Sequence, residues 1–124
     1  TVGAAAPLQA AGVTALELSR DFYEDLVAGY ARRRALLLDI LERHEFMCYP
    51  PQGAYYIMTN INQFKYDNDV EFARRLVTDV GVAAVPGSSF YHDPLLGRNQ
   101  VRFCFCKRDE TLDEAGRRVQ ALRA

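Results

Sequence analysis

The sequence predicts an α+β fold, a two-layer sandwich in which helices cover one small, mostly antiparallel sheet of three or four strands. Apolar residues recur at helical spacing over residues 19–44, 69–80 and 109–122. Short segments rich in aromatic and β-preferring residues stand between these helices, at residues 46–49, 54–61, 82–85 and 100–106. The resulting order is α, α, β, β, α, β, β, α. The 124 residues suffice for one core of this kind.

Two helices open the chain. Residues 1–18 are small and mostly apolar, and Pro7 suits the first turn of a helix that buries little by itself. Ser19 is a candidate N-cap for a long second helix ending near His44. The run Arg32-Arg33-Arg34 lies within this helix, where consecutive side chains point about 100° apart. These arginines cannot all serve one site, and we expect a solvated face.

Residues 46–49 and 54–61 are expected to pair as antiparallel strands across the turn at residues 50–53. The next helix spans residues 69–80. Asp67 or Asn68 can cap its start, and Gly81 suits its C-terminal end.

The second half of the sheet follows this helix. A short buried strand is expected at residues 82–85, followed by a turn at residues 86–89 and a loop at residues 90–99 that carries Tyr91 and His92. A strand at residues 100–106 leads to the last helix, with Asp109 as its N-cap and Leu122 near its end.

The strand at residues 100–106 contains the most informative charge. The side-chain period of two places Val101, Phe103 and Phe105 on one face, and Arg102 on the other face with Cys104 and Cys106. A desolvated guanidinium needs an anionic or hydrogen-bonding partner, and its planar fork matches a carboxylate. The partner can be a bound carboxylate, an internal Asp or Glu, or water at an exposed edge strand. The sequence leaves all three open.

Composition excludes some classes of function. With 15 Lys and Arg against 16 Asp and Glu, the formal net charge is -1, so no basic field attracts nucleic acid. No apolar run approaches the roughly 20 residues of a membrane span, and the N-terminus has no signal-peptide pattern. We therefore expect a cytoplasmic protein. Its three cysteines suit reduced core thiols, and their spacing with the two histidines matches no zinc motif.

Three segments in order carry a family resemblance: PQGAYY at residues 51–56, GVAAVPGSSFY at residues 81–91, and VRFCFCK at residues 101–107 leading into Glu110-Thr111-Leu112. They resemble the C-terminal small domain of the fold-type I (class I/II) aminotransferases that use pyridoxal phosphate. Within this family, the residues of these segments are most similar to the branch containing the kynurenine, glutamine and methionine aminotransferases.

The resemblance implies that Arg102 binds the α-carboxylate of an amino-acid substrate. It also implies that residues 1–18 continue from a large domain and that residues 19–124 form the small domain of a homodimeric transaminase, which exchanges an amino group between an L-amino acid and a 2-oxo acid. The lysine that holds pyridoxal 5'-phosphate belongs to that large domain. Lys65 lies in a polar loop and Lys107 would face away from Arg102, so neither suits the role. We expect no catalytic or cofactor-binding residue in this chain, and no activity from it alone.

Other interpretations remain open at this stage. A small-molecule or RNA-binding module of the same fold would use Phe103 and Phe105 as stacking platforms. A structural fragment would self-associate through the apolar residues 1–18. His92 is expected to be a loop histidine near solvent, and Ser88 and Ser89 to be turn residues, since no nucleophile motif surrounds them.

Overall fold

The computed structural model describes residues 3–122, so Thr1 and Val2 of the expected first helix lie outside the described residues. The helices and strands are α1 (Ala6–Leu16), α2 (Arg20–Arg43), β1 (Met47–Tyr49), β2 (Tyr56–Asn60), α3 (Asp69–Arg75), β3 (Val85–Pro86), β4 (Gln100–Cys104) and α4 (Asp109–Val119). Their order and the antiparallel sheet confirm the predicted α+β two-layer sandwich.

The sheet has the order β1-β2-β4-β3, and every neighbouring pair is antiparallel. β1 and β2 form the expected hairpin, with Cys48 opposite Thr59. β4 runs between β2 and β3, so that Arg102 lies opposite Met58 on one side and Val85 on the other. β4 is therefore an inner strand, and the exposed-edge alternative for Arg102 is wrong.

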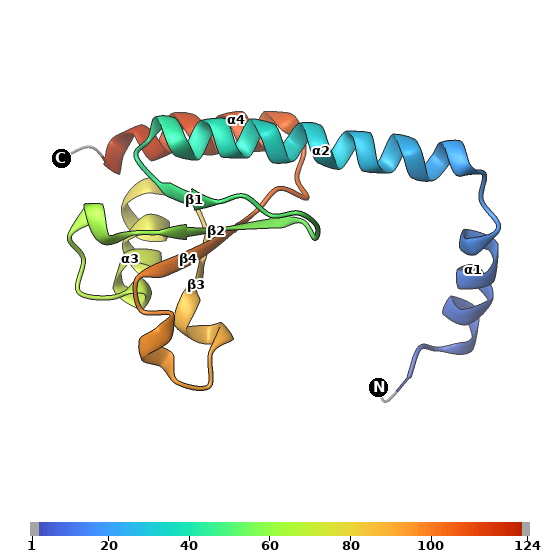
Figure 1. Ribbon diagram of the computed structural model, residues 1–124, viewed down its shortest axis with the longest axis horizontal. Helices are drawn as coiled ribbons and strands as arrows, with labels where there is room; N and C mark the ends of the chain where they lie inside the picture. The colour runs from blue at the N-terminus through green and yellow to red at the C-terminus, as the bar shows by residue number, and fades with distance from the viewer. Residues whose placement is uncertain (1–2, 123–124) are drawn as a thin grey trace.

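Helices α2, α3 and α4 pack on one face of this sheet. Figure 1 shows α2 and α4 side by side along one side of the sheet. Residues of α2, α3 and α4 form a single core with the strand residues that point toward them: Leu37, Ile40, Leu41, Phe46, Ile57, Phe72, Leu76, Val101, Phe103, Phe105, Leu112 and Val119. The predicted parity of β4 is confirmed, because Val101, Phe103 and Phe105 are at most 5% exposed.

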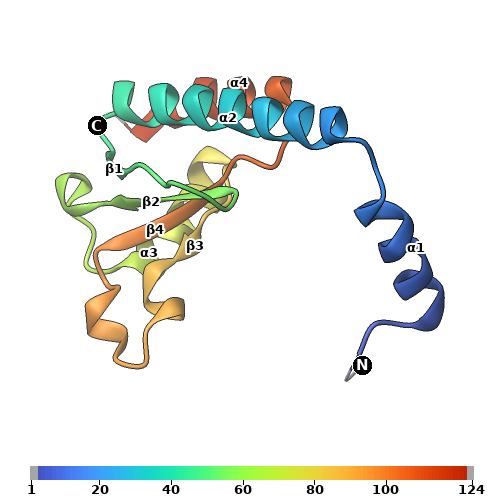
Figure 2. The ribbon, with the colours of Figure 1, turned by 45° about the vertical axis from the view of Figure 1, so that its right-hand side comes forward.

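The first helix stands apart from the sandwich. α1 and the beginning of α2 extend beyond the sheet in both views (Figure 1, Figure 2). No residue of α1 is buried, and Leu16 is 83% exposed. The buried residues of α2 all lie in its second half, at Leu37, Ile40 and Leu41. The expectation that the first helix buries little surface is confirmed.

The predicted helix caps agree only in part with the structure. Ser19 precedes α2, but its side chain makes no capping hydrogen bond. Asn68, not Asp67, caps α3, because its side chain accepts from the Glu71 amide at 2.9 Å. Arg108 occupies the N-cap position of α4, and Asp109 is the first helical residue. The helix dipole favours a negative charge at either position, so charge alone could not distinguish the two.

The strands are shorter than their apolar runs. β3 covers residues 85–86 and so shares only residue 85 with the predicted strand 82–85, although Val82 is buried in the core. β4 ends at Cys104 instead of Cys106. Residues 76–80 continue α3 as a wider π-helical turn that ends at Gly81, whose φ of +76° suits glycine. An apolar side chain can be buried without strand pairing, and for this reason β3 and β4 are shorter than the apolar runs that predicted them.

The run of three arginines is not a uniformly solvated face. Arg32 forms an ion pair with Asp109 of α4. Arg33 lies 3.8 Å from the same carboxylate, and its guanidinium carbon lies 5.2 Å from the centre of the Tyr30 ring. Arg34 donates to the carbonyl of Pro51 at 3.0 Å. The three side chains diverge as the helical spacing predicts, but each finds a protein partner.

Candidate functional site

Arg102 lies on the face of the sheet that carries no helix within residues 3–122. We call this the helix-free face, and it is formed by Tyr56, Met58, Arg102 and Cys104 of the two inner strands. All four are half-buried, whereas their neighbours Ile57, Val101 and Phe103 point toward the helices. The alternation along β4 therefore places the guanidinium where a ligand can approach it.

Two aromatic rings contact the Arg102 guanidinium. Its central carbon lies 4.5 Å from the centre of the Tyr56 ring and 4.2 Å from the centre of the Phe90 ring. Tyr56 belongs to β2, on one side of β4, and Phe90 ends the short 3₁₀ turn Gly87–Phe90 that follows β3 on the other side. Cation–ring contacts contribute about 0.5–2 kcal/mol each, and they restrict the guanidinium without using its N–H donors in strong hydrogen bonds.

Within residues 3–122, Arg102 has no carboxylate partner. No Asp or Glu oxygen of that part of the chain lies within the 4.0 Å that defines an ion pair. The internal ion pair that the sequence left open is therefore absent from the described residues. A positive charge supported by two rings and lacking an anion can bind an anionic ligand with its planar donor edge.

Cys104 lies on the helix-free face two residues after Arg102. Burial raises the pKa of its thiol above the ordinary value, and the neighbouring Cys106 raises it further, while Lys107 and Arg102 lower it. All three cysteines are free thiols, but Cys106 is exposed and the other two are only half-buried. Cys48 packs against the core, but Cys104 and Cys106 do not, so the prediction of core thiols was wrong for these two residues.

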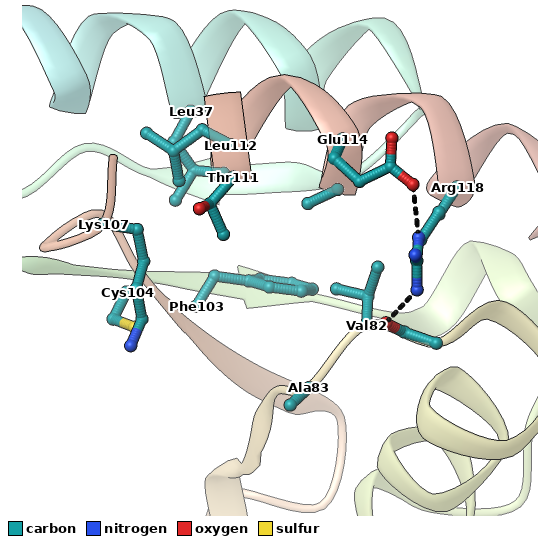
Figure 3. A pocket seen from close by; sticks show the side chains of 12 residues that line it. Leu37, Val82, Ala83, Phe103, Cys104, Lys107, Thr111, Leu112, Glu114 and Arg118 are labelled. Atoms are coloured by element: carbon teal, nitrogen blue, oxygen red, sulfur yellow. Dashed lines mark hydrogen bonds and ion pairs between the residues drawn. The ribbon is translucent and has the colours of Figure 1, made fainter. Parts of the chain in front are cut away.

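A cavity of about 370 Å³ lies on the opposite, helix-covered side of the sheet (Figure 3). Its apolar lining comes from Leu37, Val82, Phe103, Leu112 and Ala115, and Arg102 is not among its lining residues. Figure 3 shows Arg118 between Glu114 and the chain before Val82. Arg118 donates to Glu114 at 2.7 Å and to the carbonyl of Gly81 at 3.2 Å. Cys104 of the helix-free face also lines this cavity, whereas Arg102, Tyr56 and Met58 do not.

Neither lysine lies on the helix-free face. Lys65 is exposed in the loop before α3, in a left-handed conformation with φ of +56°. Lys107 follows the end of β4, so the argument from strand parity does not apply to it, and it lines the cavity on the helix side (Figure 3).

The loop residues that the sequence singled out are exposed. His92 and Tyr91 both lie at the surface, and the Tyr91 hydroxyl donates to the Gln100 side chain at 3.2 Å. At the turn, the backbone amide of Ser88 donates a hydrogen bond to the side chain of Asp69 at 2.7 Å. Within residues 3–122 no three His, Cys, Asp or Glu side chains gather in an arrangement that could hold a metal ion.

Sequence reasoning missed Tyr56 and Phe90 as neighbours of Arg102. Both residues lie in the quoted PQGAYY and GVAAVPGSSFY segments, but those segments gave no sign that the two rings meet one guanidinium. The contacts depend on β4 lying between β2 and β3, and local periodicity in the sequence does not predict the order of strands in a sheet.

The stacking alternative is contradicted by burial. Phe103 is 5% exposed and Phe105 is 1% exposed, and both belong to the core beneath the helices. Neither ring can stack on a nucleotide base without disrupting that core. In addition, none of the helices within residues 3–122 combines the length and apolar character that crossing a bilayer requires.

Comparison with known proteins agrees with this architecture. The sequence profile of the family described as aminotransferase class I and II matches residues 2–119. A probable N-succinyldiaminopimelate aminotransferase of Mycobacterium tuberculosis is 36% identical over 126 residues, which cover 94% of this chain and 32% of the relative. The methionine aminotransferase of Escherichia coli is 31% identical, with 94% of this chain and 30% of the relative covered.

A solved structure gives the same result in three dimensions. The N-succinyldiaminopimelate aminotransferase structure from Mycobacterium tuberculosis superimposes with a TM-score of 0.86 at 37% identity, covering 94% of this chain and 30% of that chain. The chain thus spans about a third of the length of the relatives it matches. On the evidence of both sequence and fold, the chain belongs to the class I and II aminotransferase family.

Proposed function

We propose that this chain is the substrate-carboxylate-binding, C-terminal small domain of a pyridoxal-phosphate-dependent aminotransferase. In this proposal residues 19–124 form the domain, and residues 1–18 connect it to a preceding large domain. The complete enzyme transfers an amino group between an L-amino acid and a 2-oxo acid. The observation that carries the proposal is the Arg102 guanidinium, which lies on the helix-free face between two rings and has no anion among the described residues.

Arg102 has the chemistry that the role requires. A guanidinium can donate two parallel N–H bonds to the two oxygens of a carboxylate, which fixes the position and the plane of that group. The ring contacts of Tyr56 and Phe90 limit rotation of the guanidinium before the ligand arrives, so less side-chain entropy is lost on binding. Binding one end of the amino acid in this way directs its amino group to a defined place.

The residues of this chain do not fit the cofactor. Pyridoxal phosphate serves as the electron sink in transamination and is held through a lysine amine. Lys65 lies in an exposed loop, and Lys107 follows the end of β4 and lines a cavity to which Arg102 does not contribute. We therefore assign the cofactor to the large domain, and we expect the 124-residue chain alone to be inactive.

The same proposal covers partners and location. The large domain of the same polypeptide supplies the rest of the active site, and the complete enzyme is a homodimer in the cytoplasm. A role in binding nucleic acid is not supported, given the net charge of -1 and the buried Phe103 and Phe105.

The test compares Arg102→Ala and Arg102→Lys in the full-length polypeptide that contains this chain. Each charged hydrogen bond contributes roughly 1.5–3 kcal/mol, so loss of two such bonds should raise the KM for L-amino acids by about 100-fold or more. Arg102→Lys keeps the charge but not the fork and should recover only part of the affinity. Cofactor absorbance should not change.

Arg75→Ala is the matched control, because Arg75 is an exposed arginine whose ion pair within residues 3–122 is with Asp79 of the same helix. Its KM should stay within about twofold of the unmodified enzyme. An Arg102→Ala enzyme with an unchanged KM would contradict the proposed function.

A further inference from the structure

Asp69 is the one buried carboxylate within residues 3–122. It is only 2% exposed, although it begins α3, where most side chains reach solvent. Its Oδ2 accepts a hydrogen bond of 2.7 Å from the backbone amide of Ser88, 19 residues away in sequence. Burying a carboxylate costs free energy unless hydrogen bonds compensate it, so this contact is a strong constraint on Ser88.

Asp69 also holds the other end of the same loop. Its backbone amide donates to the carbonyl of Arg98 at 2.8 Å. The segment between Ser88 and Arg98 leaves β3 and returns to β4, so one residue of α3 contacts both of its limbs. The 3₁₀ turn Gly87–Phe90 is thereby fixed relative to the sheet.

This turn carries the ring that contacts Arg102. Phe90 follows Ser88 by two residues, and its ring centre lies 4.2 Å from the Arg102 guanidinium carbon. Phe90 is 45% exposed, and it is not part of the hydrophobic core. The position of its ring therefore depends on the turn itself, and Asp69 supplies the side-chain hydrogen bond that holds this turn against α3.

The helix does not need this carboxylate in order to form. Asn68 already caps α3, and Phe72 provides the apolar contact between the helix and the core. A buried charge is weak evidence for stability, since uncharged residues often replace one at no loss. The specific consequence of Asp69 is the geometry of the turn that it holds.

We propose that Asp69 is a positioning residue for the carboxylate site: through the Ser88 amide it places Phe90 against Arg102 and so orients the guanidinium for its ligand. The inference rests on the proposed function, because it concerns the binding site that Arg102 is assigned there. Asp69 itself touches no ligand, and its effect on affinity passes through Ser88, Phe90 and Arg102 in that order.

The experiment measures the inhibition constant of an unreactive monocarboxylic acid against the full-length enzyme, with the corresponding uncharged amide as a ligand control. Asp69→Ala removes the acceptor and should weaken binding of the acid at least tenfold. Asp69→Asn keeps the shape and a neutral acceptor, so it should rescue part of the affinity and weaken binding by about fivefold. Phe90→Leu, which removes the ring, should also weaken it by about fivefold. Inhibition by the uncharged amide should change by less than twofold in all three variants.

Two controls separate positioning from a loss of stability. Asn68→Ala removes the cap of the same helix but leaves the Ser88 contact, so it should lower stability without changing the inhibition constant. Asp93→Asn alters a carboxylate that accepts from the Leu95 amide in the neighbouring turn, and it should leave the inhibition constant of the acid unchanged. If Asp69→Ala does not fold, the inhibition constants of Asp69→Asn and Phe90→Leu still test whether Asp69 positions the carboxylate site.

The outcomes distinguish the two proposals. If Asp69→Asn binds the acid as well as the unmodified enzyme while Arg102→Ala does not, the positioning role is wrong and the proposed function stands. If Asn68→Ala weakens binding as much as Asp69→Asn, the effect is structural and the positioning role is again wrong. If Arg102→Ala itself leaves binding unchanged, the carboxylate site is wrong and the inference falls with it.

Discussion

Gly97 packs directly against the backbone of Gly87. A Cβ atom at Gly97 would lie 2.4 Å from the carbonyl carbon of Gly87, and a Cβ atom at Gly87 would lie 2.6 Å from the carbonyl oxygen of Gly97. Both neighbours are backbone atoms, which cannot rotate out of the way as a side chain can. The absence of side chains at these positions lets the turn that carries Phe90 pack against the next turn of the loop.

We therefore predict that Gly97→Ala destabilises the chain by about 1–3 kcal/mol, the usual cost of forcing extra atoms into a packed site. Gly53→Ala is the matched control, because nothing lies within 4 Å of the added atom there. Urea denaturation followed by circular dichroism measures both changes. Equal midpoints for the two variants would contradict the close packing of Gly87 and Gly97.

The core prediction concerns Phe105, which is 1% exposed and lies beneath α2, with its ring centre 6.2 Å from that of Tyr30. Phe105→Ala should lower the free energy of unfolding by about 3–5 kcal/mol, because it removes buried apolar surface and leaves a cavity. Phe22→Ala removes the same ring from a 48%-exposed position and should cost within about 0.5 kcal/mol. Thermal or urea unfolding of both variants provides the comparison.

The two helix caps should differ in their contribution to stability. The Asn68 side chain accepts from the Glu71 amide, so Asn68→Ala should lower the free energy of unfolding by about 1 kcal/mol. Ser19 occupies the cap position of α2 without a capping hydrogen bond, and Ser19→Ala should cost only a few tenths, about 0.3 kcal/mol. A larger loss for Ser19→Ala than for Asn68→Ala would show that the side-chain bond of Asn68 is not formed.

The pH dependence of Cys48 reactivity should differ between the folded and the unfolded chain. Burial, followed by the negative charge of Glu42, raises the pKa of this thiol from 9.0 to about 11. The rate of Cys48 alkylation by iodoacetamide should therefore reach half of its maximum at about pH 11 in the folded chain and at about pH 9 in the unfolded chain. Mass spectrometry of the labelled peptides measures both rates.

The same shift has a consequence for stability. Below pH 9 both states keep the Cys48 proton, so this thiol adds no pH dependence. Between about pH 9 and pH 11 the unfolded chain loses the proton first, so the free energy of unfolding falls as the pH rises. Cys48→Ala should reduce this fall. A Cys48 alkylation rate that is half-maximal near pH 9 in the folded chain would exclude the raised pKa.

The elements and the parity of β4 could be predicted from sequence because they depend on neighbours a few residues apart. Alternation of Val101, Phe103 and Phe105 placed these residues in the core, and the same rule placed Arg102 on the opposite face. Element ends were less accurate. Strand pairing stops where the partner stops, so β4 ends at Cys104 although the apolar pattern continues to Phe105.

The sequence by itself thus determined the fold class, the family and the arginine that defines the candidate site. Only the tertiary structure decided which residues surround that arginine: Tyr56, Phe90 and, through Ser88, Asp69. Helical and strand periodicity arise from the geometry of one segment and are visible in its residues. The contacts around Arg102 join four separate segments, and they follow from the strand order and register that packing of the whole core selects.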